Sequence, residues 1–231
     1  MGTDIHGVFQ ARNMQTNTWK NIPHGYEMQR HYQLFAVLAG VRNGVGFAGC
    51  VTGQAVSPIA DPRGYPEDFG TRGLRDFDDV EEGADANELV DDRHPASYEV
   101  VDPRRQKYYK AEEVRSIWMG DHSFSWLGGE EMMHWHESAP IIVASGIIGR
   151  LEYEAWNKVS EPKSYCGGIS GGGIVVIDES QVNKPGEPMN WTHVSVTWDR
   201  GLKGDLAYFF DEVQRLVKEH GTIRFVFGFD S

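Results

Sequence analysis

Apolar and polar residues alternate in several short segments of the chain, and this two-residue period is typical of strands that bury one face. The first such segment is Asp4–Ala11, and Trp19–Ile22 follows a polar turn as its candidate hairpin partner. Later in the chain, strand character is found in Gly173–Asp178, His193–Asp199 and Thr222–Phe229. The pattern therefore predicts strands near both ends of the chain.

Apolar residues at spacings of three and four predict amphipathic helices over Gln29–Arg42 and Gly204–His220. Asn43-Gly44 and Gly221 follow these segments, and residues of this kind favour the left-handed conformation that ends a helix. Both helices should bury one apolar face.

Three segments with a less regular pattern are also assigned to helices. Lys110–Met119 and residues 126–137 are predicted as short helices, the second interrupted or preceded by the Gly128-Gly129 pair. Pro140–Trp156 begins like a strand, but its later apolar residues repeat at helical spacing, so we expect it to be mostly helical.

Strands and helices are interleaved without a regular β–α repeat. We therefore expect a single domain, residues 1–231, of the α+β class, with a mixed, largely antiparallel sheet packed with several helices. Residues 61–105 differ from the rest, because prolines, glycines and acids crowd together and no hydrophobic period persists. We interpret them as a long irregular acidic insertion or mobile loop.

The charge is concentrated in this segment. The chain has 231 residues and a formal net charge of −12. Between Asp61 and Asp102 there are 14 acids and four arginines, so this span alone contributes −10. An acidic chain argues against nucleic acid as a partner, since binding to phosphates requires clustered lysines and arginines. The nearly neutral remainder can accept a small-molecule anion, and the acidic span could contact a host protein.

The chain carries two cysteines, Cys50 and Cys166, without a CxxC pair or a secretory leader, which favours free thiols in a reducing compartment. The longest apolar stretch is well short of the roughly 20 residues that cross a bilayer, so we expect no membrane association. The expected location is the cytoplasm of a host cell.

The opening Gly2–Gly7 is the first candidate site. Asp4 and His6 are two residues apart on a predicted strand and so share a face, where a carboxylate and an imidazole can bind a divalent metal such as Zn, Mn or Mg. The Asp-x-His-Gly string resembles the first signature of metallophosphoesterases, but the later signature blocks are absent. We assign Asp4, His6 and His122 as metal ligands. The alternative is that Asp4 and His6 pair with nearby backbone or an arginine.

A second cluster lies in the residues from Asp121 to Trp126. Here His122 is the candidate catalytic residue, and Ser123, Ser125 and Trp126 are candidates for binding substrate. The alternative is a core in which these side chains satisfy one another. A serine triad is less well supported, because the sequence has no nucleophile elbow.

The turn that contains Arg63 and Asp68 is the third candidate. The planar guanidinium of Arg63 suits a phosphate or carboxylate, and Asp68 or Asp230 is the candidate general base, completing the catalytic set with His122. The alternative is a rigid loop anchored by an Arg–Asp pair.

Several blocks together resemble an uncharacterised protein family encoded by bacteriophages and prophages. They are MGTDIHGV, RHYQLFAVLAGVRNG, PIADPRGYPEDFG, DHSFSWL and the closing RFVFGFDS. The family is similar in opening with Gly-x-Asp-Ile-His, in a central Leu-Phe-Ala helix that ends in Val-Arg-Asn, and in a His-Ser-x-Ser-Trp-Leu block. The chain departs from the family at Tyr65, where leucine is more usual, and at Phe124, where histidine is frequent. The second departure removes a possible ligand and weakens a zinc site in that block. The resemblance implies no known activity, but it places the candidate polar residues in matching blocks.

Two functions are open at this point. The first is a phage-encoded, cytosolic, metal-dependent hydrolase of a phosphorylated or nucleotide-like small molecule. The second is a non-enzymatic binder that sequesters or inhibits a host factor through its acidic, aromatic-rich surface, with residues 76–92 as the contact.

Overall fold

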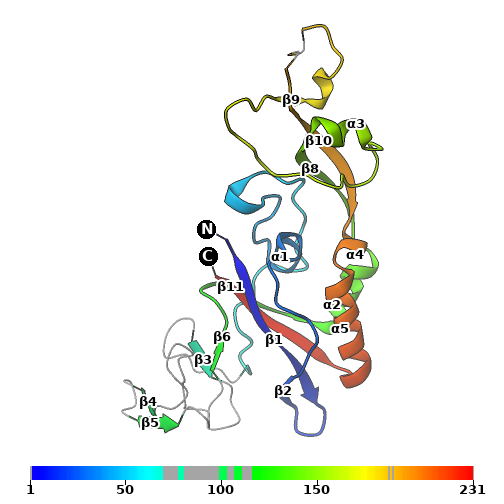
Figure 1. Ribbon diagram of the computed structural model, residues 1–231. Coiled ribbons are helices and arrows are strands. Elements are labelled where there is room, and N and C mark those ends of the chain that lie inside the picture. The colour runs from blue at the N-terminus through cyan, green and yellow to red at the C-terminus, as the bar shows by residue number, and fades with distance from the viewer. Residues whose placement is uncertain are drawn as a thin grey trace. The chain divides into compact units, whose positions relative to one another are not determined.

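The protein is described by a computed structural model in which the chain forms two compact units (Figure 1). The residues that the structure describes are 2–69, 78–80, 99–102, 107–110, 116–186, 188 and 190–230. The first unit comprises Met1–Gly2, His31–Pro58 and Trp135–Ala207, and the second comprises Thr3–Arg30, Ile59–His134 and Tyr208–Ser231. Each unit is assembled from segments far apart in the sequence, although the sequence pattern indicates no boundary.

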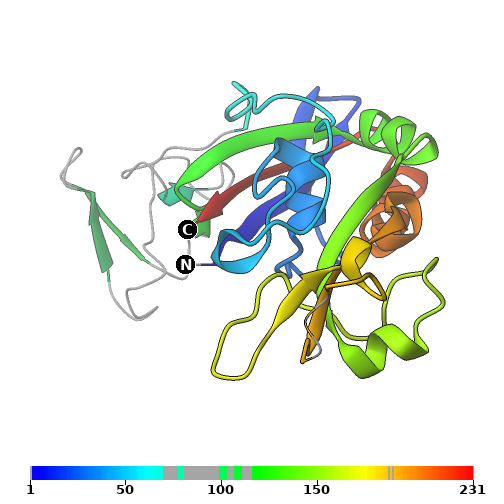
Figure 2. The ribbon, with the colours of Figure 1, turned by 90° about the horizontal axis from the view of Figure 1, so that it is seen from above.

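A four-stranded antiparallel sheet forms the centre of the second unit. Its strands, in spatial order, are β2 (Thr18–Ile22), β1 (Asp4–Asn13), β11 (Ile223–Asp230) and β7 (His122–Gly128). Figure 2 shows β11, in red, between β1, in blue, and β7, in green. Strands β1 and β11 pair from Asp4 opposite Asp230 to Ala11 opposite Ile223. The strands predicted near both ends of the chain are confirmed, and they are neighbours.

One face of this sheet packs against helix α5 (Ala207–His220). The rings of Phe9 and Phe225, from β1 and β11, lie 6.1 Å and 5.5 Å from the ring of Phe209 on the helix. All three rings are completely buried. Burial of one phenylalanine contributes about 2 kcal/mol to stability, so this aromatic layer is a major part of the core.

The opposite face carries a smaller apolar cluster. Phe69, Met119 and Val226 are buried there, and Tyr65 and Phe124 pack against them. The rings of Tyr65 and Phe124 are stacked with centroids 4.7 Å apart. The proline-rich turn is therefore anchored on the sheet.

The first unit contains a three-stranded mixed sheet. Its strands, in spatial order, are β8 (Ile141–Gly149), β10 (His193–Gly201) and β9 (Val176–Asp178). Strand β10 pairs antiparallel with β8 and parallel with β9. Its core includes three buried tryptophans, Trp156, Trp191 and Trp198.

Short helices and two-stranded ladders complete the described elements. The helices are α1 (Tyr32–Ala39), α2 (Gly129–Glu137), α3 (Arg150–Ala155) and α4 (Leu202–Asp205), with 3-10 turns η1 (Phe47–Gly49) and η3 (Glu179–Gln181). The ladders pair β3 (Asp78–Val80) with β6 (Ser116–Trp118) and β4 (Glu99–Asp102) with β5 (Lys107–Lys110). The expected α+β class, with a mixed and largely antiparallel set of strands, is confirmed.

Two segments that were predicted as helices contain strands where the structure describes them. Pro140–Trp156 was expected to be mostly helical, but its first half is β8, and only Arg150–Ala155 is helix. The two-residue burial period of β8 and its nine pairs with β10 outweigh the local helical spacing. Within Lys110–Met119, Ser116–Trp118 is a strand, and residues 111–115 lie outside the described chain.

The first predicted helix is shorter than expected. Helix α1 ends at Gly40, whose φ of 70° is left-handed and whose N–H bonds the carbonyl of Ala36, so Asn43-Gly44 is not its end. Most of the predicted acidic insertion, residues 61–105, lies outside the described chain, because residues 70–77, 81–98 and 103–105 are not described.

Candidate functional site

Three of the predicted site residues meet at one end of the sheet in the second unit. Asp4 and Asp230 are opposite each other in the β1–β11 ladder, and His6 lies on the same face as Asp4 because side chains alternate along a strand. The backbone N–H of Asp4 donates to Asp230 Oδ1 at 2.9 Å. His6 Nε2 lies 3.4 Å from Asp230 Oδ2, and both side chains are 24% exposed. Strand pairing thus produces an imidazole–carboxylate pair.

Arg30 joins this group from the chain that follows the hairpin. Its Nε and Nη2 donate to Asp4 Oδ1 and Oδ2 at 2.9 Å and 2.7 Å. This bidentate bond holds the pKa of Asp4 below its usual value, although partial burial opposes the effect. Both side chains are nearly half exposed, at 45% and 46%. We call Asp4, His6, Arg30 and Asp230 the strand-end cluster.

His122 does not join the strand-end cluster. Its register partner on β11 is Phe229, so it lies on the face opposite Asp230 and its ring stacks near that of Phe229, with centroids 6.1 Å apart. Instead, His122 Nδ1 is 2.9 Å from Ser123 Oγ, and Nε2 is 4.0 Å from Asp121 Oδ1. We call Asp121, His122 and Ser123 the β7 trio.

The predicted metal ligands are therefore divided between two groups. Asp4 and His6 share a face, but both oxygens of Asp4 are bonded to Arg30, and His122 is on the other side of the sheet. Within the described part of the chain, no three His, Cys, Asp or Glu side chains are grouped as a metal site. Metal binding stays a prediction.

Arg63 is held by protein groups in the predicted substrate-binding block. Its guanidinium donates to both carboxylate oxygens of Glu131 and, at 3.3 Å, to the carbonyl of Trp126. It also lies 5.0 Å from the centre of the Trp126 ring. Ser125 is fully buried, and its Oγ accepts the N–H of Arg63 at 3.2 Å. This arrangement matches the alternative of an anchored loop, with Glu131 in place of Asp68.

Asp68 lies far from Asp230. It accepts a hydrogen bond of 2.5 Å from Arg224, at the other end of β11, six residues and therefore about 20 Å from Asp230. Arg224 is 3% exposed and also donates to Gln10 at 2.8 Å. Desolvation by burial is the largest single influence and raises the pKa of Asp68, but the hydrogen bond and the charge of Arg224, with further hydrogen bonds, together outweigh it and lower this pKa. Of the two candidate bases, only Asp230 is in the strand-end cluster.

Two cavities lie away from these groups. A groove of about 490 Å³ in the second unit is lined by residues that include Tyr26, Tyr208 and Glu212. In the first unit, a cavity of about 20 Å³ is lined by residues that include Tyr32 and Asn43. Neither is lined by a residue of the strand-end cluster or the β7 trio.

Two residues of these groups were given no role from the sequence: Arg30 of the strand-end cluster and Asp121 of the β7 trio. Arg30 is 26 residues from Asp4, and nothing in the local pattern of either segment indicates that they pair. Asp121 is next to His122 in the sequence, so it could have been included from adjacency alone.

The comparisons with known proteins give no relative: no family model, no curated protein and no solved structure matches the chain. Among the described helices, none is both long enough and apolar enough to cross a membrane. Most of residues 76–92, the predicted contact surface for a host protein, lies outside the described chain. The function is therefore inferred from the two polar groups.

Proposed function

We propose that the chain is a cytoplasmic, phage-encoded hydrolase of a phosphorylated or nucleotide-like small molecule, and that the strand-end cluster is its reaction site. The observation that supports this most is the 3.4 Å approach of His6 Nε2 to Asp230 Oδ2. A carboxylate close to one nitrogen of an imidazole attracts the positive charge that the ring gains when its other nitrogen accepts a proton. The nearby Arg30 supplies a positive charge for an anionic substrate.

The reaction divides these roles among the four side chains. His6 takes a proton from a water molecule through Nδ1, while Asp230 stabilises the imidazolium that forms. The water oxygen bonds to phosphorus as the bond from phosphorus to the leaving oxygen breaks, and the imidazolium then returns the proton to the leaving group. Arg30 faces the phosphate charge, and Asp4 fixes the orientation of the guanidinium.

A divalent metal is a second way to use the same residues. Asp4 and His6 would hold the ion, which requires Asp4 to leave Arg30. The ion would polarise the phosphate oxygen. Metal analysis of the purified chain distinguishes this arrangement from the metal-free one.

The test measures turnover of p-nitrophenyl phosphate, bis-p-nitrophenyl phosphate and nucleoside triphosphates, with EDTA and separately with Zn, Mn or Mg. We expect His6→Ala and Asp230→Asn to lower kcat at least about 100-fold, because general base catalysis has this size. Asp68→Asn and His220→Ala are matched controls away from the cluster, and they should retain turnover.

Circular dichroism and urea unfolding show whether each variant is folded. Wild-type protein that is folded but turns over none of these substrates under any metal condition contradicts the proposal. Equal kcat values for His6→Ala, Asp230→Asn and wild type also contradict it.

A further inference from the structure

The β7 trio has the side chains of a nucleophilic serine centre. Ser123 Oγ is 2.9 Å from His122 Nδ1, within hydrogen-bond distance, and His122 Nε2 is 4.0 Å from Asp121 Oδ1. The imidazole and the carboxylate are 36% and 49% exposed, so a ligand in solution can reach them. The hydroxyl of Ser123 contacts Nδ1 of His122, and the carboxylate of Asp121 lies on the Nε2 side of the ring. The trio is therefore identified by these contacts and not by a sequence motif.

The backbone at Ser123 is unusual in a way that supports this role. Its φ of 52° is left-handed, which is uncommon for a residue other than glycine and concentrates at functional sites. The partner strand β11 has a register shift between Phe227 and Phe229, next to this position. Just before the trio, a Cβ atom built at Gly120 would lie only 2.3 Å from the carbonyl oxygen of Phe229. The surrounding chain therefore holds Ser123 in a conformation that an isolated strand would not adopt.

A neighbouring serine shows what a structural role looks like in the same strand. Ser125 is completely buried, and its Oγ accepts the backbone N–H of Arg63. Ser123 is only partly buried, and its hydroxyl meets an imidazole instead of the backbone. Of these two serines, Ser123 is the one with a base.

We infer that Ser123 is the nucleophile of a second reaction centre, separate from the strand-end cluster, that acts on small carboxylic esters. A neutral ester suits this centre better than a phosphate dianion, because the charged side chain beside His122 is an acid. The inference does not depend on the phosphate hydrolase proposed above, since the two groups have no residue in common.

The covalent step balances with groups that the chain supplies. Ser123 Oγ bonds to the carbonyl carbon, and its proton passes to His122 Nδ1. When the tetrahedral intermediate collapses, the bond to the alcohol oxygen breaks, and the alcohol takes the proton from His122. Water then attacks the acyl-serine through the same imidazole, which releases the acid and restores the hydroxyl.

The test treats the full chain with a fluorophosphonate, which reacts with activated serines: the bond from Oγ to phosphorus forms, the bond from phosphorus to fluorine breaks, and fluoride leaves as His122 takes the proton. Intact mass and peptide mapping should show one adduct, on Ser123. His122→Gln should slow labelling at least tenfold. With p-nitrophenyl acetate, wild type should give a burst of p-nitrophenol.

Ser123→Gly separates the loss of the hydroxyl from the loss of the fold, because glycine accepts a φ of 52° without strain. This variant should be folded and give no adduct and no burst. Ser195→Ala, an exposed serine in β10, is the matched control and should label as wild type does.

The inference is overturned if folded wild type forms no adduct, if the adduct maps to another serine, or if Ser123→Gly labels at the same rate. The result is distinguishable from that of the phosphate hydrolase. Loss of labelling in Ser123→Gly with unchanged phosphate turnover supports both proposals. Loss of phosphate turnover in His6→Ala with unchanged labelling shows that the two centres are separate.

Discussion

Gly120 occupies a position where no other residue fits without moving the chain. Its φ is 87°, and a Cβ atom built on it would lie 2.3 Å from the carbonyl oxygen of Phe229. The next residue, Asp121, donates its N–H to the same oxygen at 2.7 Å. This close approach fixes the path by which the chain enters the β7 trio.

Gly120→Ala should destabilise the fold by about 2–4 kcal/mol, because it adds both backbone strain and a steric clash with β11. Gly64→Ala is the matched control: its φ of 74° is also left-handed, but no atom lies within 4 Å of its Cβ position. The control should cost only about 1 kcal/mol. Urea unfolding measures both values, and equal losses would show that the contact with Phe229 is unimportant.

The sequence predicts the candidate polar residues better than their partners. Asp4 and His6 share a face because the two-residue period of a strand requires it, and this follows from the sequence alone. Their bonds to Arg30 and Asp230 depend on how distant segments pair. The pairing of Asp68 with an arginine 156 residues away is equally invisible in a local pattern.

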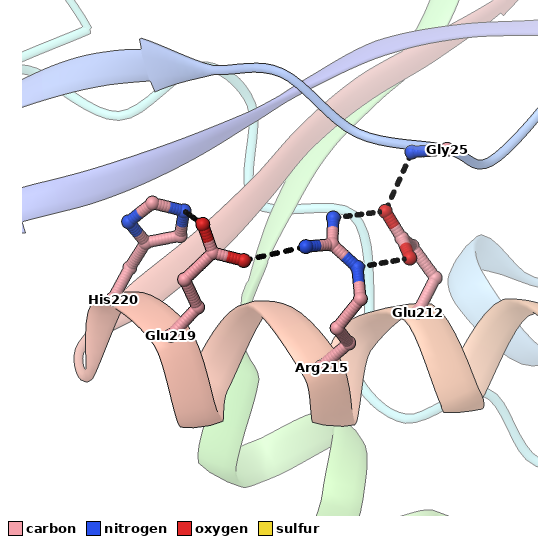
Figure 3. A network of polar contacts seen from close by, with 5 residues as sticks. All are labelled: Gly25, Glu212, Arg215, Glu219 and His220. Atoms are coloured by element: carbon pink, nitrogen blue, oxygen red, sulfur yellow. Dashed lines mark hydrogen bonds and ion pairs between the residues drawn. The ribbon is translucent and has the colours of Figure 1, made fainter.

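Helix α5 is joined to the segment after the hairpin by one carboxylate. Glu212 accepts the backbone N–H of Gly25 at 2.6 Å and two bonds of 2.8 Å from Arg215, which also donates to Glu219 (Figure 3). The bonds from Arg215 are the largest cause that lowers the pKa of Glu212, from 4.5 to about 2. The charged form of Glu212 therefore stabilises the folded chain.

Glu212→Gln should lower the free energy of unfolding at pH 7 by about 1 kcal/mol, because the amide cannot replace the charge-assisted bonds. The pKa of Glu212 is lower in the folded than in the unfolded chain, so its contribution is present above pH 4.5 and lost as the pH falls toward 2. The difference between variant and wild type should thus shrink over this range.

Urea unfolding at several pH values between 7 and 2.5 measures the effect. Glu219→Gln is the control, because Glu219 is 55% exposed and bonds only to side chains of its own helix in Figure 3. It should change stability by less than 0.5 kcal/mol, within the usual range for exposed pairs of about 0–1 kcal/mol. A Glu212→Gln effect that does not depend on pH would show that the charge is unimportant.

At the scale of elements, the sequence pattern fails where two periods overlap. The long helix and the end strands have a single clear period, and the structure confirms them. In Pro140–Trp156 the buried residues Ile142, Ala144 and Ile148 follow the two-residue period of a strand, whereas the apolar residues Ile147, Leu151 and Ala155 repeat at helical spacing. Pairing with β10 decides for a strand, and this pairing joins segments some 50 residues apart. Tertiary contacts therefore override local spacing here.

Over the whole molecule, most of the net charge lies in a different part of the sequence from the strand-end cluster. Residues 61–102 carry −10 of the net −12, so the remainder is nearly neutral. The strand-end cluster draws its four side chains from Asp4–Arg30 and from the end of β11, outside this acidic span. The acidic span and the cluster can therefore be altered independently, and this separates the hydrolase from the host-protein binder.

Neutralising part of the acidic span tests which function depends on it. The variant replaces four acids by their amides, namely Asp85, Glu88, Asp91 and Asp92, and changes the net charge from −12 to −8. A control of equal charge replaces four exposed acids elsewhere, namely Glu137, Glu154, Asp199 and Asp211. Under the proposed hydrolase, both variants keep the phosphate turnover of wild type, because neither alters the strand-end cluster.

If the chain is instead a binder that uses its acidic span, pull-down from host lysate should capture a partner with wild type and with the control, but not with the span variant. Capture should also weaken as salt is raised, since screening acts on exposed charges. Loss of capture by both variants alike would indicate a response to net charge alone. Loss of turnover in the span variant but not in the control would show that catalysis depends on the acidic span. That result would contradict the view that the span and the strand-end cluster act independently.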